Sequence, residues 1–267
     1  MVSAIATMNS TILDVFQGSP ADPVRLPLFG VLPATLIVSV YLMVVLRWGP
    51  QFMAGRKPYN LKKAMLAYNL FQVLMNSSLF IMAFYYLFVK QTYDFRCMII
   101  PWDHPDKQVE RLMSYSYYLN KILDLIDTVF FVLRKSNKQI TVLHVYHHAL
   151  MVIATPIVNH LYGPGGQYAT MGTLNLFVHA VMYAYYFAAA LYPQMKNKLW
   201  LKKYITKLQM VQFMILLVQS ILTVWLNPSC TVPMPIQYIQ LAVASSMMVM
   251  FGNFYYHTYV KVKSKSE

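Results

Sequence analysis

Three histidines stand close together in the segment LHVYHHALM, residues 143–151, which is otherwise apolar. His144, His147 and His148 are spaced i, i+3 and i+4, so a helix would present all three imidazoles on one face. Imidazole can bind a metal ion, transfer a proton or act as a nucleophile. Polar side chains are costly in lipid, so the segment predicts a functional site if this helix spans a membrane.

Three further apolar segments carry polar residues at helical spacing. KILDLIDTVFFVLRK would place Lys121, Asp124 and Thr128 on one face, with Asp127 at its edge. NLFVHAVMYAYY and KKYITKLQMVQF would add the stripe Asn175, His179, Tyr183 and Tyr186 and the pair Gln209 and Gln212. A lone buried histidine or a single Lys–Asp pair is usually structural. Four segments with polar faces instead predict a chamber that they line together, in the cytosolic half and middle of the membrane.

The composition indicates that these segments belong to a membrane protein. Of the 267 residues, 58% are hydrophobic and 12% are charged, whereas a soluble domain carries about twice that charge. A very apolar soluble helical protein is the alternative. Residues 1–25 lack the basic and apolar pattern of a cleavable signal peptide.

The apolar runs predict an all-α, multi-pass membrane protein, with a single membrane-embedded domain over residues 1–267. A transmembrane helix needs about 20 apolar residues. We expect seven such helices, at 27–47, 66–89, 113–133, 141–160, 167–191, 205–226 and 236–257.

The distribution of basic residues predicts the orientation. Lys and Arg gather after the first, third, fifth and seventh expected spans, whereas the loops NHLYGPGGQ and NPSCTVPMP contain none. By the positive-inside rule the C-terminus is then cytosolic and the N-terminal segment 1–25 lumenal, with Asn9 in a glycosylation sequon. Much of the net charge of +13 reflects this topology, and it would also attract a polyanion such as a CoA thioester.

The cytosolic tail, residues 259–267, ends in KSKSE. This ending resembles the dilysine signal for retrieval to the endoplasmic reticulum. A short basic tail beside the membrane is the other interpretation.

Cys97 and Cys230 are the only cysteines, and both fall in segments expected to be lumenal. A disulfide persists on that oxidising side, so we predict that they are bridged, with two unpaired thiols as the alternative. Both lie far from the expected cytosolic mouth and are poor candidates for a catalytic thiol.

Metal binding is the first chemical interpretation of the histidine cluster. Membrane desaturases and hydroxylases hold two iron ions in several such clusters, but this chain has seven histidines and only one HxxHH pattern. A single zinc ion held by the cluster and His179 stays open as an alternative. A seven-span receptor or transporter would use the polar residues as a ligand or proton site.

Catalysis by imidazole itself is the second interpretation. A neutral histidine in a chamber poor in water can attack a thioester and carry the acyl group while a neighbour transfers protons. Exclusion of water would protect the acyl-imidazole from hydrolysis.

The four segments KILDLIDTVFFVLRK, LHVYHH, NLFVHAVMYAYY and LQMVQF resemble, in this order, the motifs of the fatty acid elongase family, the very-long-chain 3-oxoacyl-CoA synthases. The resemblance covers expected spans three to six. One departure is Asp124, where the family motif often has Glu. The resemblance implies condensation of a long-chain acyl-CoA with malonyl-CoA to a 3-oxoacyl-CoA two carbons longer. It also implies that six helices form a barrel of two inverted three-helix units around an acyl tunnel.

The resemblance further implies roles for the site residues. His147 would accept the acyl group, His179 would act as base or proton relay near malonyl-CoA, and His144 and His148 would set tautomers and support the enolate. Substrate contacts would come from Lys121, Asp124, Asp127, Thr128, Asn175, Tyr183, Tyr186, Gln209 and Gln212. Lys202 and Lys203 would meet CoA phosphates, with a basic loop that only marks topology as the other interpretation.

The same resemblance sets the expected ligands and partners. Acyl-CoA and malonyl-CoA are substrates, and no metal or other cofactor is expected. Expected partners are membrane lipid, the 3-oxoacyl-CoA reductase that takes the product and a second copy of the chain, but not nucleic acid. An iron-dependent desaturase or hydroxylase is the main alternative function.

Overall fold

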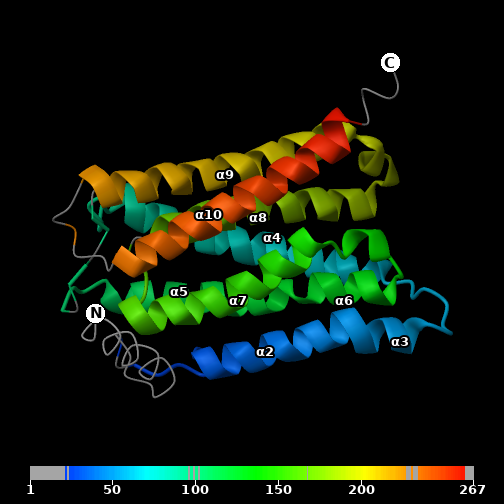
Figure 1. Cartoon of the computed structure of the whole chain (residues 1–267), viewed down its shortest axis with the longest axis horizontal. Helices are drawn as coiled ribbons and strands as arrows, with labels where there is room; N and C mark the ends of the chain where they lie inside the picture. Colours follow the sequence, from blue (N-terminus) through cyan, green and yellow to red (C-terminus); the bar gives the residue numbers. More distant parts are fainter. Residues whose placement is uncertain are drawn as a thin grey trace, which may run out of the picture. The chain divides into compact units, whose positions relative to one another are not determined.

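The structure is a computed structural model, and it describes Asp22, 24–95, 97–98, 100–101, 103–166, 168–226, Cys230 and 234–261. Every regular element in these ranges is helical (Figure 1). The α-helices are α2 (Val31–Met43), α3 (Gly49–Met53), α4 (Lys62–Phe84), α5 (Lys107–Asp124), α6 (Ile126–Leu133), α7 (Val142–Tyr162), α8 (Tyr168–Leu191), α9 (Leu199–Leu226) and α10 (Met234–Tyr255). The predicted all-α class is therefore confirmed. The sequon at Asn9 and the tail lysines Lys263 and Lys265 lie outside the described residues.

Five helices in the described part of the chain are long and apolar enough to cross a membrane: Val31–Met53, Lys62–Val89, Val142–Tyr162, Tyr168–Leu191 and Leu199–Leu226. They correspond to five of the seven predicted spans, and the chain is a multi-pass membrane protein. The predicted spans 113–133 and 236–257 are also helical but are not among these five, and α6, within the first of them, is only eight residues long. Charged residues lower the apolarity of α5, and Gln237 and Gln240 lower that of α10.

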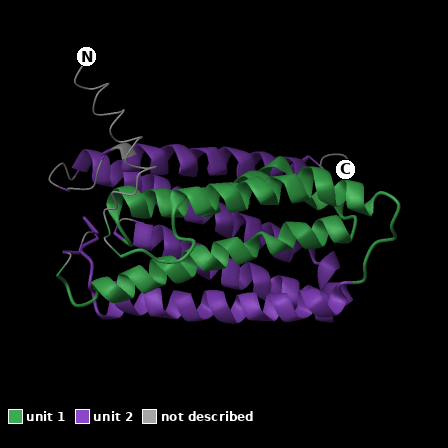
Figure 2. Cartoon of the chain, turned by 90° about the horizontal axis from the view of Figure 1, so that it is seen from below, with its two compact units in different colours: residues 1–60, 102–165 green, residues 61–101, 166–267 purple. Residues whose placement is uncertain are grey.

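The chain divides into two compact units that alternate along the sequence (Figure 2). Unit 1 comprises Met1–Asn60 and Trp102–Gly165, and it contains α2, α3, α5, α6 and α7. Unit 2 comprises Leu61–Pro101 and Gly166–Glu267, and it contains α4, α8, α9 and α10.

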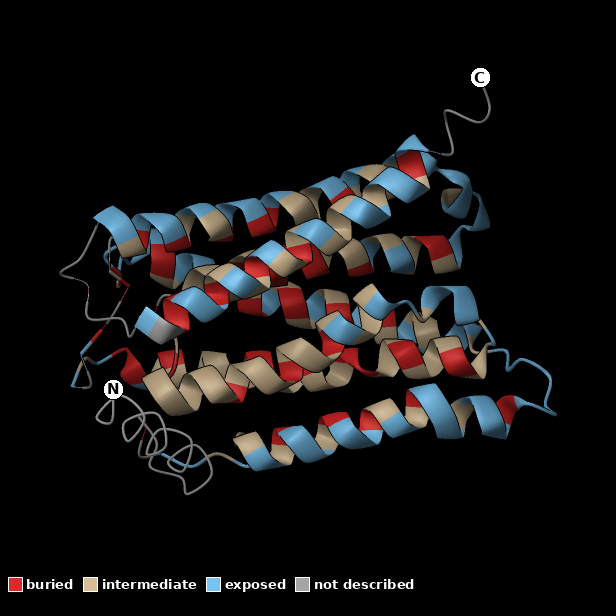
Figure 3. Cartoon of the chain, viewed as in Figure 1, coloured by how far each residue is buried: buried red, intermediate tan, exposed pale blue. Residues whose placement is uncertain are grey.

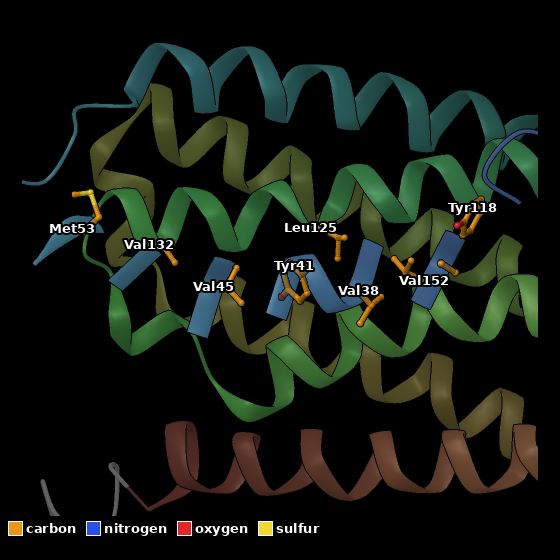
Figure 4. Close-up of a cluster of buried hydrophobic side chains, with 9 residues drawn as sticks. Val38, Tyr41, Val45, Met53, Tyr118, Leu125, Val132 and Val152 are labelled. Atoms are coloured by element: carbon orange, nitrogen blue, oxygen red, sulfur yellow. The ribbon is translucent and has the colours of Figure 1, made fainter. Parts of the chain in front are cut away.

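The core of unit 1 lies where α2 packs against α5, α6 and α7 (Figure 4). One face of the first span supplies the buried residues Ala34, Val38, Tyr41 and Val45, which recur at helical spacing. On another face Leu36 and Val40 are 58% and 56% exposed. A helix that is apolar on both its buried and its exposed faces is typical of a membrane span, whose outer face meets lipid.

The first span extends further than predicted, from Val31 to Met53 instead of ending near residue 47. Pro50 lies inside it and lacks the N–H that an α-helical hydrogen bond needs. A wider π-helical turn at Val44–Trp48 precedes the proline and lets the helix continue through it.

The third predicted span, 113–133, is divided in the structure. Helix α5 begins earlier, at Lys107, and ends at Asp124, and α6 begins at Ile126. A tighter turn at Leu125, whose N–H donates to the carbonyl oxygen of Ile122, separates them. The interruption falls between Asp124 and Asp127, within the segment KILDLIDTVFFVLRK, for which the sequence predicts site residues.

Ionic and polar contacts hold two segments of unit 1 against the start of α5. Arg111 forms an ion pair with buried Asp22, with its Nε 2.5 Å from Oδ2. Lys107 Nζ lies 2.8 Å from Glu110 Oε2. The backbone N–H of Gly165, at a positive φ of 71°, donates to Ser114 Oγ over 3.1 Å.

Unit 2 is built on two helix pairs, α4 with α8 and α9 with α10. Ring contacts mark both, at 5.2 Å between Phe80 and Phe177 and 5.4 Å between Phe213 and Phe251. Figure 3 shows buried residues at intervals along α9 and α10, with exposed residues between them.

A disulfide joins Cys97 to Cys230, with an S–S distance of 2.01 Å. It connects the segment after α4 to the segment after α9. These are the two cysteines that the sequence predicts as a pair.

Candidate active site

The three clustered histidines occupy the first two turns of α7. Thr141 caps the helix, because its Oγ1 accepts a hydrogen bond from the backbone N–H of His144 over 3.2 Å. The His144 and His148 ring centroids are 4.2 Å apart, and those of His147 and His148 are 5.8 Å apart. His148 is buried and the other two are partly buried. The common face that the spacing predicts is therefore present.

A chain of hydrogen bonds fixes His144 from two other helices. Thr128 Oγ1, on α6, lies 2.9 Å from His144 Nε2, and the Tyr41 hydroxyl, on α2, lies 2.9 Å from the same oxygen. Thr128 is fully buried and Tyr41 is 4% exposed. Because Nε2 is engaged, Nδ1 is the other position for the mobile proton of a neutral ring, and the Thr128 contact constrains the tautomer. Thr128 was expected at the site, but sequence reasoning missed Tyr41.

Lys121 and Asp124 form a buried ion pair on the last turn of α5. Lys121 Nζ lies 2.8 Å from Asp124 Oδ2, and both residues are 2% exposed. Lys121 also lies over the ring of Tyr117 and within electrostatic range of His147. A buried ion pair contributes little net stability because desolvation offsets the attraction. Asp127, as predicted, lies at the edge of this buried face and is only partly buried.

In unit 2, the predicted stripe on α8 is buried over most of its length. Asn175, His179 and Tyr183 are 3%, 5% and 0% exposed, and the His179 and Tyr183 ring centroids are 5.9 Å apart. Tyr186 differs from the other three because it is 41% exposed, although its ring still contacts Tyr183 at 6.0 Å.

Helix α9 carries the predicted glutamines. Gln212 is buried, and Gln209 Nε2 lies 3.8 Å from the Met182 sulfur on α8. The helix begins at Leu199 and not near residue 205, so Lys202 and Lys203 lie within its first turns and not in a loop as predicted. Lys203 Nζ lies over the Tyr255 ring at 5.7 Å. Strong helix formers such as Leu and Lys extend the helix beyond the apolar run that was used to predict it.

Helix α4 supplies a set of buried polar residues that sequence reasoning missed: Asn69, Gln72 and Asn76 are 4%, 0% and 0% exposed. Gln72 Nε2 donates to the Tyr68 hydroxyl over 3.1 Å, and that hydroxyl lies 3.4 Å from the hydroxyl of Tyr183. The spacing of Tyr68, Gln72 and Asn76 at i, i+4 and i+8 is the same signal that was used on α8, and it would have found them.

Among the described residues, no group of three or more His, Cys, Asp and Glu side chains is arranged to hold a metal ion.

The sequence is similar to those of known proteins over most of its length. The family model ELO: GNS1/SUR4 matches residues 28–267. The chain is 40% identical over 254 residues to very long chain fatty acid elongase F of Drosophila simulans, covering 93% of this chain and 95% of that protein. It is 37% identical over 236 residues to very long chain fatty acid elongase 7 of Rattus norvegicus, covering 86% and 82%. It is 38% identical over 254 residues to very long chain fatty acid elongase 5 of Xenopus tropicalis, covering 92% and 82%. The chain therefore belongs to the ELO (GNS1/SUR4) family of very-long-chain fatty acid elongases.

Proposed function

We propose that the chain is the condensing enzyme of fatty acid elongation, a very-long-chain 3-oxoacyl-CoA synthase that works through an acyl group carried by His147. The reaction class rests on family membership, because the curated relatives are elongases that match over most of their length. The residue roles rest on the site chemistry: an imidazole cluster whose member His144 is anchored by Thr128, beside a buried Lys–Asp pair.

In the first half-reaction, a ring nitrogen of His147 attacks the thioester carbon of a long-chain acyl-CoA. A C–N bond forms, the C–S bond breaks, and CoA leaves as a thiolate that takes up the proton lost by the imidazole. The attacking nitrogen must be unprotonated. The neighbouring imidazoles would favour the tautomer of His147 that leaves this nitrogen without a proton.

In the second half-reaction, malonyl-CoA loses CO2. The enolate carbon that remains then attacks the carbonyl carbon of the acyl group. The new C–C bond forms, the C–N bond to His147 breaks, and His147 regains its proton with one proton taken up overall. We assign His179 as the base or proton relay for malonyl-CoA, with Asn175, Tyr183, Gln209 and Gln212 orienting thioester and CoA groups. His148 supports the enolate together with His144.

Lys202 and Lys203 are our candidates for the CoA phosphates. Both lie near the N-terminus of α9, where a helix favours anions. The single domain over 1–267, the barrel of six helices and the acyl tunnel inferred from the family resemblance are part of the same proposal.

We also propose a location and partners. The enzyme would reside in the endoplasmic reticulum membrane, with the N-terminus lumenal and the C-terminus cytosolic. It would pass its product to a 3-oxoacyl-CoA reductase in that membrane.

The test is intact-mass measurement of purified protein after incubation with a long-chain acyl-CoA. We expect a mass increase equal to the acyl group, absent in His147→Ala and retained in Tyr146→Phe, a neighbouring and partly exposed control. Cys97→Ser/Cys230→Ser should also retain the adduct. Elongated product without any adduct in the unmodified protein would overturn the role of His147.

The proposed function and the iron-dependent alternative differ in the expected effect of metal removal. If the proposed function is correct, condensation should persist after treatment with a strong iron chelator. Loss of activity that Fe²⁺ restores would favour a desaturase or hydroxylase.

A further inference from the structure

Four polar side chains on α9 and α10 of unit 2 form a group that the proposed mechanism does not use. We call Gln219, Ser220, Gln237 and Gln240 the glutamine cluster. Ser220, Gln237 and Gln240 are 0%, 1% and 4% exposed, and Gln219 is partly buried. In the described part of the chain, hydrogen-bond partners are lacking for these buried atoms: Gln219 Oε1, Ser220 Oγ and both amide atoms of Gln237 and Gln240. An unpaired buried polar group costs free energy, so the cluster indicates a site for a polar group of a ligand.

Two contacts define how α9 and α10 lie against each other. Phe213 on α9 contacts Phe251 on α10, with ring centroids 5.4 Å apart. Nearer the start of α9, the hydroxyl of Thr206 lies 3.4 Å from that of Tyr259, in the turn that follows α10. The two helices therefore run antiparallel, and the end of α9 lies beside the start of α10.

This register brings the members of the glutamine cluster to one end of unit 2. At about 1.5 Å per residue, Gln240 lies within about one turn of the level of Ser220, and Gln237 lies about one turn nearer the start of α10. The neighbouring Gln219 donates from Nε2 to Thr170 Oγ1 on α8 over 3.0 Å. The cluster thus lies where α8 and α10 begin and α9 ends.

The glutamine cluster is well separated from the site residues of α8. Thr170 lies in the first turn of α8, about 14 Å along the helix from His179 at about 1.5 Å per residue. Thr170 Oγ1 also donates to Met98 Sδ over 3.0 Å, beside the disulfide-bonded Cys97. In the orientation proposed above, this is the lumenal end of the unit, opposite the expected entry of CoA substrates.

The chemistry of the cluster favours a neutral group that both donates and accepts hydrogen bonds. A primary amide offers N–H donors and an oxygen acceptor, and a hydroxyl group can pair with either. Its four side chains are neutral, so a carboxylate buried among them would not be compensated by a member of the cluster. The methyl end of an unsubstituted acyl chain would leave the amides unpaired.

We propose that the glutamine cluster binds a hydroxyl group at the far end of a long acyl chain, so that acyl-CoA substrates hydroxylated at the end opposite the thioester are preferred. The inference rests on the proposed function and names a substrate class for it. A site that hydrogen-bonds a substrate hydroxyl discriminates against the analogue without it, because its own buried polar groups are then left unpaired.

The test compares two series of acyl-CoA substrates with purified full-length protein. One series has unsubstituted chains, and the other has chains of the same lengths with a hydroxyl group at the far end. Where the hydroxyl reaches the cluster, kcat/KM for the hydroxylated chain should exceed that for the unsubstituted chain by about tenfold or more. Shorter chains should show no such preference, because their hydroxyl groups stop before the cluster.

Matched variants identify the side chains responsible. The double variant Gln237→Met/Gln240→Met keeps side chains of similar length but removes both amides, so it should abolish the preference. Tyr238→Phe, at an exposed position on the same helix, should retain it. Without substrate, the melting temperature of the double variant should not fall, because apolar side chains replace unpaired buried amides.

Three outcomes would overturn the hydroxyl site while leaving the proposed function intact. These are equal kcat/KM values for the two series at every length, a preference that the double variant retains, and a clear fall in its melting temperature, which would show that the amides are paired within the protein. Failure to elongate either series would contradict the proposed function, and this inference with it.

Discussion

At the scale of single residues, the histidine cluster depends on a few hydroxyl groups from other helices. Thr128 Oγ1 contacts both His144 Nε2 and the Tyr41 hydroxyl; Thr128 and Tyr41 are buried, and His144 is partly buried. An imidazole in such surroundings can hold one tautomer only while its hydrogen-bond partner remains. In the proposed mechanism, in which His144 helps to set tautomers, the chemistry assigned to His147 would depend on Thr128, a side chain that does not itself react.

Replacement of Thr128 by Val should remove this support. The Tyr41 hydroxyl and His144 Nε2 would lose a buried partner, so the free energy of unfolding should fall by about 1–3 kcal/mol. The rate of acyl-adduct formation should fall as well. Thermal unfolding in detergent and intact-mass kinetics measure the two effects.

Thr128→Ser is the matched control, because it keeps the hydroxyl and loses only a methyl group. It should retain the adduct and most of the stability. If Val and Ser behave alike, the hydroxyl of Thr128 has no part in orienting His144.

At the scale of elements, the ends and interruptions of helices decide where the polar groups lie. Thr141 starts α7 so that the three histidines fall in its first two turns. The turn at Leu125 separates Asp124 on α5 from Thr128 on α6. The loop after α7 is held by Gly165, whose N–H donates to Ser114 on α5. These local features set the register of the site residues within unit 1.

Gly165→Ala should strongly destabilise the protein. Gly165 has a positive φ of 71°, and a Cβ there would overlap the side chain of Glu110. The left-handed conformation alone costs an L-residue about 1–2 kcal/mol, and displacement of Glu110 adds to this. The melting temperature should fall clearly in a thermal-shift measurement.

Gly172→Ala provides the comparison within α8. A Cβ at Gly172 would meet no described atom within 4 Å, and alanine favours a helix over glycine by about 1 kcal/mol. This variant should be neutral or slightly stabilising. An unchanged melting temperature in Gly165→Ala would contradict the close packing of the loop against Glu110.

At the scale of the whole molecule, the chain passes repeatedly between two compact units. Helix α4 belongs to unit 2, although its neighbours α3 and α5 along the chain belong to unit 1. In unit 2 the Cys97–Cys230 disulfide ties together segments 133 residues apart in sequence. A disulfide is stable in an oxidising compartment, which agrees with the lumenal location proposed for both cysteines.

The proposed orientation predicts which end of the protein can be glycosylated. Asn9 should carry a glycan when the protein is made in the presence of endoplasmic reticulum membranes, because the N-terminus would be lumenal. An endoglycosidase should therefore increase the gel mobility of the unmodified protein but not that of Asn9→Gln. A sequon added to the C-terminal tail should stay unmodified. Glycosylation of the tail sequon in place of Asn9 would reverse the orientation.

The amino-acid sequence by itself determined the helical class, most of the spans, the shared face of the three histidines and the candidate residues on α5 to α9. These features follow from apolar length and from spacing within one or two helical turns, which are local properties of the chain.

Tertiary structure decided which groups meet. Tyr41 and Thr128 are 87 residues apart, and Tyr68 and Tyr183 are 115 apart, so no local pattern couples them. It also decided that the span expected at 113–133 is divided at Leu125. Such contacts and boundaries depend on how helices pack, because side chains from distant segments reach each other only once the fold has formed.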